Sequence, residues 1–184
     1  MPEQPNVAVF TLGGTIAMTR DAGGGITPSL SAEALVASAP GLAAVARITA
    51  APVFQMPGAS LTLADLATVA RRIEQAFAEG VDGAVVVQGT DTIEETAFVL
   101  DCLLASERPV VVTGAMRGPE AAGADGPANL LAAVTVAASG ARATGVLAVL
   151  GDTVHAARHV RKGHTGLPEA FTSAPYGPLG HVME

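Results

Sequence analysis

The feature that most constrains the fold is an alternation of short, uninterrupted apolar runs with longer segments of helical periodicity. Runs of this kind are typical of parallel strands that are buried on both faces of a sheet. Strands are expected at 6–12, 48–55, 83–87, 109–113 and 145–150, the second of them interrupted by Pro52. Helices are expected between them, at 31–39, 62–79, 92–106 and 129–138. The pattern predicts an α/β fold with a mostly parallel sheet.

Capping residues support two of these helices. Thr62, with Asp65 in the first turn and Gly80 at the end, gives one helix typical start and stop signals. Thr92 and Glu95 fit a capping box that opens the next helix. From residue 155 to the end the chain is rich in glycine and proline and lacks periodicity, which predicts a long loop or a linker.

Length and composition exclude several classes of protein. At roughly 150 residues per domain, 184 residues make one α/β-sized domain. With 49% hydrophobic and only 15% charged residues, intrinsic disorder is excluded. A net charge of -7, no run of basic residues and 3% aromatic residues exclude nucleic-acid binding as the main function. The single cysteine, Cys102, favours a reducing compartment and, in mid-helix, is expected to be a small core residue.

No membrane segment or secretion signal is expected. The uncharged stretch 126–141 contains proline and polar residues and is shorter than the roughly 20 apolar residues that a spanning helix needs. The N-terminus is acidic and proline-rich and has no basic region of the kind that opens a signal peptide. We therefore expect a soluble, cytoplasmic protein.

Function in a parallel α/β sheet collects at the carboxyl ends of the strands. Gly13, Gly14 and Thr15 follow the first strand, and they match neither the dinucleotide fingerprint nor the P-loop. They predict either a tight turn that needs glycine or a site where a ligand approaches the backbone and Thr15 presents a hydroxyl. Residues 19–27, with three glycines at 23–25, are then expected to form a mobile flap over this site.

Thr90 and Asp91 follow another buried strand and precede a helix. As a pair they could simply cap that helix, but Thr92 occupies the better capping position and frees them for another role. Lys162 is the only lysine among 10 basic residues. A lysine kept where arginine carries every other positive charge suggests a need for an amine that can lose its proton; a surface lysine is the alternative. Together the three side chains suit activation of a hydroxyl nucleophile.

The histidines do not suggest a metal site. His155 and His159 have i, i+4 spacing but lack the glutamate of a zincin helix. His164 and His181 lie in glycine- and proline-rich sequence. Neither a metal nor another cofactor is expected.

Two long motifs occur in order along the chain, TLGGTIA at 11–17 and QGTDTIEETA at 88–97. They resemble the two signatures of bacterial-type L-asparaginases and glutaminase-asparaginases. Shorter matches follow in the family's order, at 114–117, 124–127 with Asn129 and Leu130, 152–153, Lys162 and 177–180. The resemblance implies a flavodoxin-like, three-layer N-terminal domain at 1–160, with the end of that domain and the start of an interdomain linker at 161–184.

The resemblance also implies an activity: hydrolysis of L-asparagine to L-aspartate and ammonia through an acyl-enzyme on a threonine. It implies Thr15 as the nucleophile of the first signature and Thr90, Asp91 and Lys162 as a second catalytic set, with Asp91 also binding the substrate's α-ammonium. The implied substrate-binding positions are Gly14, Gly58, Ala59, Ser60, Gly89 and Ala115. The implied partner is a small molecule, asparagine or glutamine, with no metal or cofactor.

The sequence departs from the family pattern at several points. The flap has no tyrosine, since Tyr176 is the only one in the chain. Gly58 and Ala59 stand where the family has a serine followed by serine or glutamine, so Ser60 or backbone amides are expected to bind the α-carboxylate. Gln88 replaces a histidine, with a mild effect expected. The family's smaller C-terminal α/β domain is absent, so we expect a homodimer or homotetramer only at full length, and the 184-residue chain to be nearly inactive.

Two other functions stay open. One is a related ammonia-releasing enzyme, either a glutaminase or a subunit of a tRNA amidotransferase, the latter normally carrying extra N-terminal sequence. The other is a non-catalytic amino-acid-binding or assembly module on the same fold. The intact set of Thr15, Thr90, Asp91 and Lys162 argues against the second, and Gly58 with the missing flap tyrosine argues for it.

Overall fold

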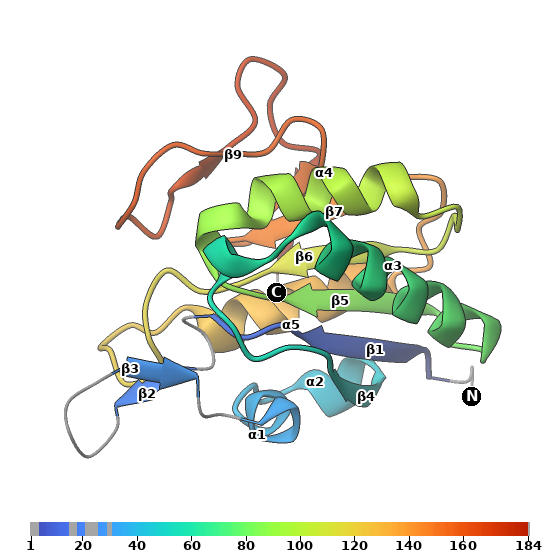
Figure 1. Ribbon diagram of the computed structural model, residues 1–184, viewed down its shortest axis with the longest axis horizontal. Helices are drawn as coiled ribbons and strands as arrows, with labels where there is room; N and C mark the ends of the chain where they lie inside the picture. The colour runs from blue at the N-terminus through green and yellow to red at the C-terminus, as the bar shows by residue number, and fades with distance from the viewer. Residues whose placement is uncertain (1–3, 15–17, 21–25, 29–30, 184) are drawn as a thin grey trace.

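A seven-stranded sheet lies between two layers of helices in the part of the chain that the structure, a computed structural model, describes: residues 4–14, 18–20, 26–28 and 31–183 (Figure 1). The parallel strands are β1 (Asn6–Thr11), β4 (Arg47–Pro52), β5 (Gly83–Val87), β6 (Val110–Thr113) and β7 (Val146–Leu150). The predicted α/β fold with a mostly parallel sheet is confirmed.

The order of the parallel strands across the sheet is β4-β1-β5-β6-β7. Numbered along the chain this is 2-1-3-4-5, the flavodoxin-like order. The direction in which strands are added reverses between β1 and β5, so the topological switch point lies beyond the carboxyl ends of these two strands.

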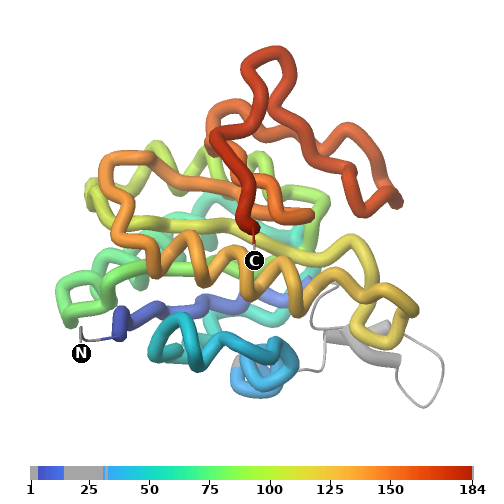
Figure 2. Tube along the Cα trace, turned by 180° about the vertical axis from the view of Figure 1, so that it is seen from behind, coloured from blue at the N-terminus to red at the C-terminus, as the bar shows by residue number. Residues whose placement is uncertain are grey.

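The helices bury both faces of the sheet. One face carries α3 (Leu63–Ala78) and α4 (Ile93–Leu103), and the other carries α1 (Ala32–Ala37), α2 (Leu42–Val45) and α5 (Gly126–Ala138) (Figures 1 and 2). Successive strand residues point to opposite faces, so Val85 joins the core under α5 while Val86 joins the core under α3 and α4. This double burial explains why the strands are apolar without interruption.

The predicted starts of α1, α3 and α4 lie within one residue of those observed, whereas α5 begins at Gly126, three residues before the predicted 129. Thr62 caps α3 in a reciprocal capping box with Asp65, and Ser31 caps α1. Thr92 makes no capping bond: the 3-10 turn η3 (Thr90–Thr92) runs directly into α4, and the Thr92 hydroxyl accepts from Gln88 Nε2 instead. The predicted capping box at Thr92 is therefore wrong.

Cys102 is exposed, so its prediction as a core residue is also wrong. The buried stripe of α4 is Ile93, Thr96, Ala97 and Leu100, and Cys102 falls off this stripe. The helix ends at Leu103, three residues before the predicted 106.

The segment after residue 152 contains strands where a loop was predicted. β8 (Thr153–Ala156) pairs antiparallel with β7, and β11 (Gly180–His181) pairs with β8 at the edge of the sheet. β9 (Arg161–Lys162) and β10 (Phe171–Thr172) form a separate two-stranded sheet, which lies beyond α4 in Figure 1. Strands of two residues have no periodicity to detect, which is why the sequence did not predict them.

Candidate active site

Three glycines meet at the switch point. Gly14 follows β1 with φ of 91°, and a Cβ built on it would collide with the backbone of Gly89, which follows β5. Gly58 begins the 3-10 turn η2 (Gly58–Ser60), and its Cβ would lie 2.9 Å from the Gly89 carbonyl oxygen. Only glycine permits this approach, so the three backbones form one surface around Gly89.

Thr90, Asp91 and Lys162 lie together beside this surface. The Lys162 Nζ donates to Thr90 Oγ1 at 2.9 Å and to Asp91 Oδ1 at 2.7 Å. Thr90 is buried, the Lys162 side chain is 10% exposed and the Asp91 side chain is 75% exposed. Such burial does not fit a surface lysine. The arrangement holds an amine between a buried hydroxyl and a carboxylate that faces solvent.

Glu94 was not singled out from the sequence, yet it contacts the lysine's own backbone. Its Oε2 accepts from the Lys162 N–H at 2.6 Å, and its Oε1 pairs with Arg161 Nη1 at 3.3 Å. The helix dipole favours a carboxylate in the first turn of any helix. For this reason the sequence gives no sign that Glu94 also contacts β9.

The motif at 124–129 braces the loop after β6. Asp125 accepts from the backbone N–H groups of Met116 (2.9 Å) and Arg117 (2.8 Å). The buried Asn129 donates to the Gly114 carbonyl at 2.9 Å and accepts from Gly151 N–H at 2.9 Å. A Cβ on Gly114 would lie 3.3 Å from Thr90 Cγ2, so the loop after β6 packs directly against Thr90.

The remaining predicted site residues lie in different settings. Ala59 and Ser60 are exposed on η2, next to Gly58. The Ala115 methyl is buried in the core under α5, which leaves only its backbone for contact with a ligand. Thr15 and residues 21–25 of the predicted flap lie outside the described residues. On either side of 21–25, β2 (Met18–Arg20) and β3 (Ile26–Pro28) pair antiparallel.

Comparison with known proteins shows the family of the chain. The profile of the family described as "Asparaginase, N-terminal" matches residues 6–184. The chain belongs to the asparaginase family.

Relatives in this family come from several organisms. The chain is 39% identical to a probable L-asparaginase 4 of Schizosaccharomyces pombe over 97% of its length and 52% of the relative's. It is 39% identical to a glutaminase-asparaginase of Pseudomonas fluorescens over 97% of its length and 51% of the relative's. A solved structure described as a probable cytoplasmic L-asparaginase of Campylobacter jejuni matches with a TM-score of 0.91 at 34% identity, covering 98% of this chain and 56% of that one. The chain thus spans about half the length of the curated relatives it matches.

Gln88 stands where the family resemblance implies a histidine, and its side chain supports the turn that carries Gly89. It is fully buried, and its Nε2 donates to the Gly89 carbonyl and to Thr92 Oγ1, both at 3.1 Å. Its Oε1 has no hydrogen-bond partner among the described residues. The side chain therefore ties the turn that carries Gly89 to the start of α4.

A buried histidine lies next to a serine hydroxyl at a place away from this site. His155 on β8 and Ser173 are both buried, and His155 Nδ1 lies 2.7 Å from Ser173 Oγ. Burial, with a smaller contribution from the charge of His181, lowers the pKa of His155 below its ordinary value.

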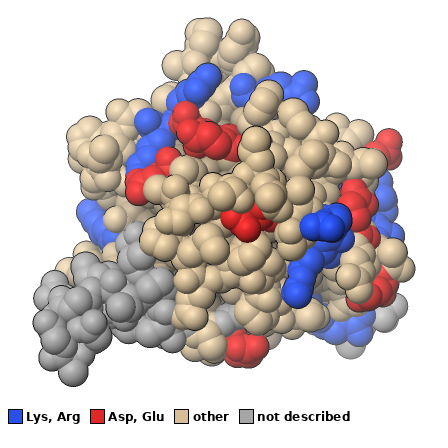
Figure 3. Space-filling view, in the orientation of Figure 1, with Lys and Arg blue, Asp and Glu red and all other residues tan. Residues whose placement is uncertain are grey.

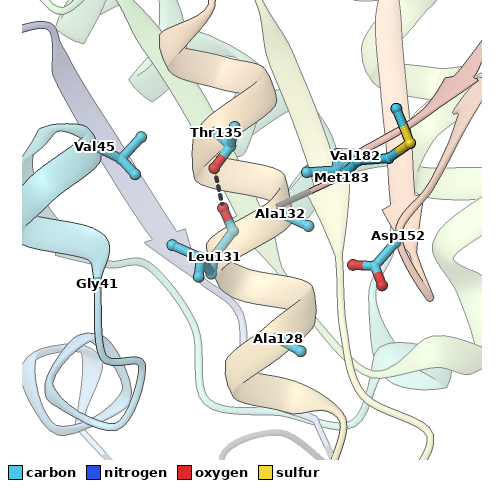
Figure 4. A pocket seen from close by; sticks show the side chains of 9 residues that line it. All are labelled: Gly41, Val45, Ala128, Leu131, Ala132, Thr135, Asp152, Val182 and Met183. Atoms are coloured by element: carbon cyan, nitrogen blue, oxygen red, sulfur yellow. Dashed lines mark hydrogen bonds between the residues drawn. The ribbon is translucent and has the colours of Figure 1, made fainter.

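A groove of about 520 Å³ lies along the other face of this asparaginase-family domain, between α5, the turn before α2 and the last described residues (Figure 4). Its lining includes Leu131, Val45 and Met183, with Asp152 at one end, and none of the predicted site residues.

On the face in Figure 3, basic and acidic residues are interspersed rather than gathered by sign. None of the helices in the described part of the chain has the length and hydropathy that crossing a membrane requires.

Proposed function

We propose that this chain is the catalytic domain of an amidohydrolase that converts L-asparagine to L-aspartate and ammonia. The observation that carries the proposal is the 2.9 Å hydrogen bond between Lys162 Nζ and Thr90 Oγ1, with Asp91 on the other side of the amine. Relatives described as L-asparaginases support the choice of substrate. The reaction needs no metal or cofactor.

The chemistry proposed for these groups is acyl transfer. A threonine hydroxyl attacks the side-chain amide carbon and gives up its proton as the new C–O bond forms. Lys162, in its unprotonated form, accepts that proton from Thr90, and Asp91 holds the amine in position. The proton passes to the departing nitrogen, which leaves as ammonia, and water then hydrolyses the ester to release aspartate. Thr15, which the first signature implies as the nucleophile, is the other candidate for the first attack.

The remaining predicted residues are proposed to bind the substrate. The exposed carboxylate of Asp91 is suited to the α-ammonium group. Ser60, or backbone amides of Gly58 and Ala59, would bind the α-carboxylate. Backbone groups at Gly14, Gly89 and Ala115 would contact the reacting amide, where N–H donors stabilise a developing oxyanion. The close glycine contacts support this, because they bring bare backbone to the switch point.

The test is ammonia release by the full gene product and its Thr90→Val variant. Removing the hydroxyl should lower kcat by about 10³-fold or more. Losses of this size are typical when one member of a cooperating catalytic set is removed. Thr68→Val is the control, because the Thr68 hydroxyl bonds within α3. Turnover of Thr90→Val within a few-fold of the control would overturn the role of Thr90.

A second candidate function is a non-catalytic amino-acid-binding or assembly module. It is favoured by one observation, that Gly58 and Ala59 bring no side-chain hydrogen-bond donor to the site. Calorimetric titration with L-asparagine separates the two, because such a module binds the amino acid without releasing ammonia. Assays with L-glutamine distinguish asparaginase from glutaminase activity, since relatives include glutaminase-asparaginases. Assembly as a homodimer or homotetramer and a cytoplasmic location also remain proposals.

A further inference from the structure

The backbone of Lys162 is held to the helix that follows the candidate nucleophile. Lys162 lies on β9, a two-residue strand that pairs with β10 and, among the described residues, is not part of the seven-stranded sheet. Its N–H donates to Glu94 Oε2 at 2.6 Å. This bond links β9 to the first turn of α4. The turn η3, which contains Thr90 and Asp91, runs directly into α4.

We propose that Glu94 is a positioning residue that sets where the Lys162 amine lies relative to Thr90. This inference rests on the proposed function of Lys162 as the base. A lysine side chain has four flexible methylene groups, so its amine is placed accurately only if the backbone that carries it is fixed. Glu94 supplies that fixed point from the same rigid unit, η3 and α4, that carries the hydroxyl and carboxylate contacted by the amine.

The carboxylate of Glu94 contacts two successive residues of β9. One oxygen accepts from the Lys162 N–H, and the second, Oε1, lies 3.3 Å from Arg161 Nη1. The Arg161 side chain is 72% exposed, so its ion pair with Glu94 adds little. The bond to the Lys162 N–H is therefore the main link between Glu94 and β9, and a charged acceptor makes it stronger than a neutral bond.

The next residue offers a matched control. Glu95 carries the same charge in the same turn of α4 and is exposed, with no side-chain hydrogen bond or ion pair among the described residues. Glu95→Ala removes a negative charge close to the site but leaves the anchor intact. A comparison of Glu94→Ala with Glu95→Ala thus separates the anchor from the general loss of a charge.

The single lysine makes the test site-specific. Protein labelled only with ¹⁵N-lysine gives one backbone amide signal and one side-chain Nζ signal, both from Lys162. In Glu94→Ala, hydrogen exchange at the Lys162 amide should be at least about tenfold faster, and the Nζ signal should move, because a charge-assisted bond is lost. In Glu95→Ala exchange should stay within about twofold of the unmodified protein, as is usual for exposed sites.

The kinetic readout uses the full gene product. Glu94→Ala should lower kcat for ammonia release by about 10- to 100-fold, the size expected when a reacting group is displaced by about 1 Å, with little change in KM. Glu94→Gln should recover most of the rate, because its amide oxygen can still accept from the Lys162 N–H. If Glu94→Ala does not fold, Glu94→Leu, which also removes the acceptor but keeps more of the side-chain volume, carries the test with the same readouts.

The outcomes are distinguishable. Where Lys162→Met abolishes turnover, unchanged amide exchange, an unmoved Nζ signal or unchanged kcat in Glu94→Ala would each overturn the positioning role. If amide exchange and the Nζ signal respond to Glu94→Ala as predicted but Lys162→Met leaves ammonia release intact, the anchor stands and the proposed role of Lys162 as the base fails instead.

Discussion

The Lys162 amine lies 2.9 Å from the Thr90 hydroxyl, although the two residues are 72 positions apart in the sequence. Thr90 comes from the turn after β5, in the middle of the sheet, and Lys162 comes from β9, beyond α4. Two independent parts of the fold therefore converge on one hydroxyl.

The close contact of Gly14 with Gly89 predicts a large loss of stability for Gly14→Ala. The substitution adds the strain of a positive φ, about 1–2 kcal/mol, and a collision with the Gly89 backbone, about 1–3 kcal/mol more. Gly80→Ala is the control, because Gly80 has φ of 98° but no atom within 4 Å of its Cβ position. Urea unfolding should show a clearly larger loss for Gly14→Ala. Equal losses would mean that the close approach does not exist.

The hydrogen bonds of Asn129 predict that this buried side chain supports the loop after β6. Asn129→Leu leaves the Gly114 carbonyl and the Gly151 N–H without these partners, which should lower the free energy of unfolding by about 2–4 kcal/mol. Because Gly114 packs on Thr90, ammonia release should fall as well. A variant as stable as the original protein would show that other groups satisfy these backbone atoms.

Burial of His155 predicts a loss of stability in mild acid. The pKa of His155 is lowered in the folded state, so below pH of about 6.5, the ordinary value of the imidazole, the unfolded chain binds a proton that the folded chain resists. The free energy of unfolding should then fall as the pH falls, by up to about 1.4 kcal/mol per pH unit for one group, until the folded-state pKa is passed.

The contribution of His155 is isolated by comparing His155→Asn with the original protein. The substitution should flatten the pH dependence between pH of about 6.5 and the folded-state pKa. Both proteins are measured by urea unfolding at a series of pH values. A slope that persists in His155→Asn would assign it to other groups.

The exposure of Cys102 predicts rapid labelling of the native protein. A thiol-specific reagent should modify one equivalent of thiol without denaturant, because accessibility is one of the two factors that control thiol reactivity. Labelling should not change ammonia release, since Cys102 lies on the outer face of α4, off its buried stripe. A thiol that reacts only after unfolding would restore the original prediction of a core residue.

The sequence predicted those features that depend on burial of whole elements. The strands could be found because burial on both faces removes polar residues from them, whereas the switch point depends on the strand order, which only the structure shows. Lys162 could be singled out because no other lysine competes with it. Cys102 was misplaced because a shift of one residue in helical phase moves a side chain from the core to solvent.

Other features could not be predicted because one residue type serves two purposes. Glu94 fits the first turn of any helix, so its bond to the Lys162 backbone has no separate mark in the sequence. Thr92 is a good capping residue, but its hydroxyl bonds with the buried Gln88 side chain and does not cap α4. β9 and β11 exist through pairing with residues distant in the chain, and two residues carry no pattern of their own.

The most direct test of the account is ammonia release from L-asparagine by the full gene product carrying Lys162→Met. This change keeps most of the side-chain volume and removes the amine, while Arg158→Met, which removes an exposed cation on the same segment, is the control. The account predicts that kcat falls by about 10³-fold or more in Lys162→Met and stays near the original value in Arg158→Met. Near-normal ammonia release by a folded Lys162→Met variant would contradict it.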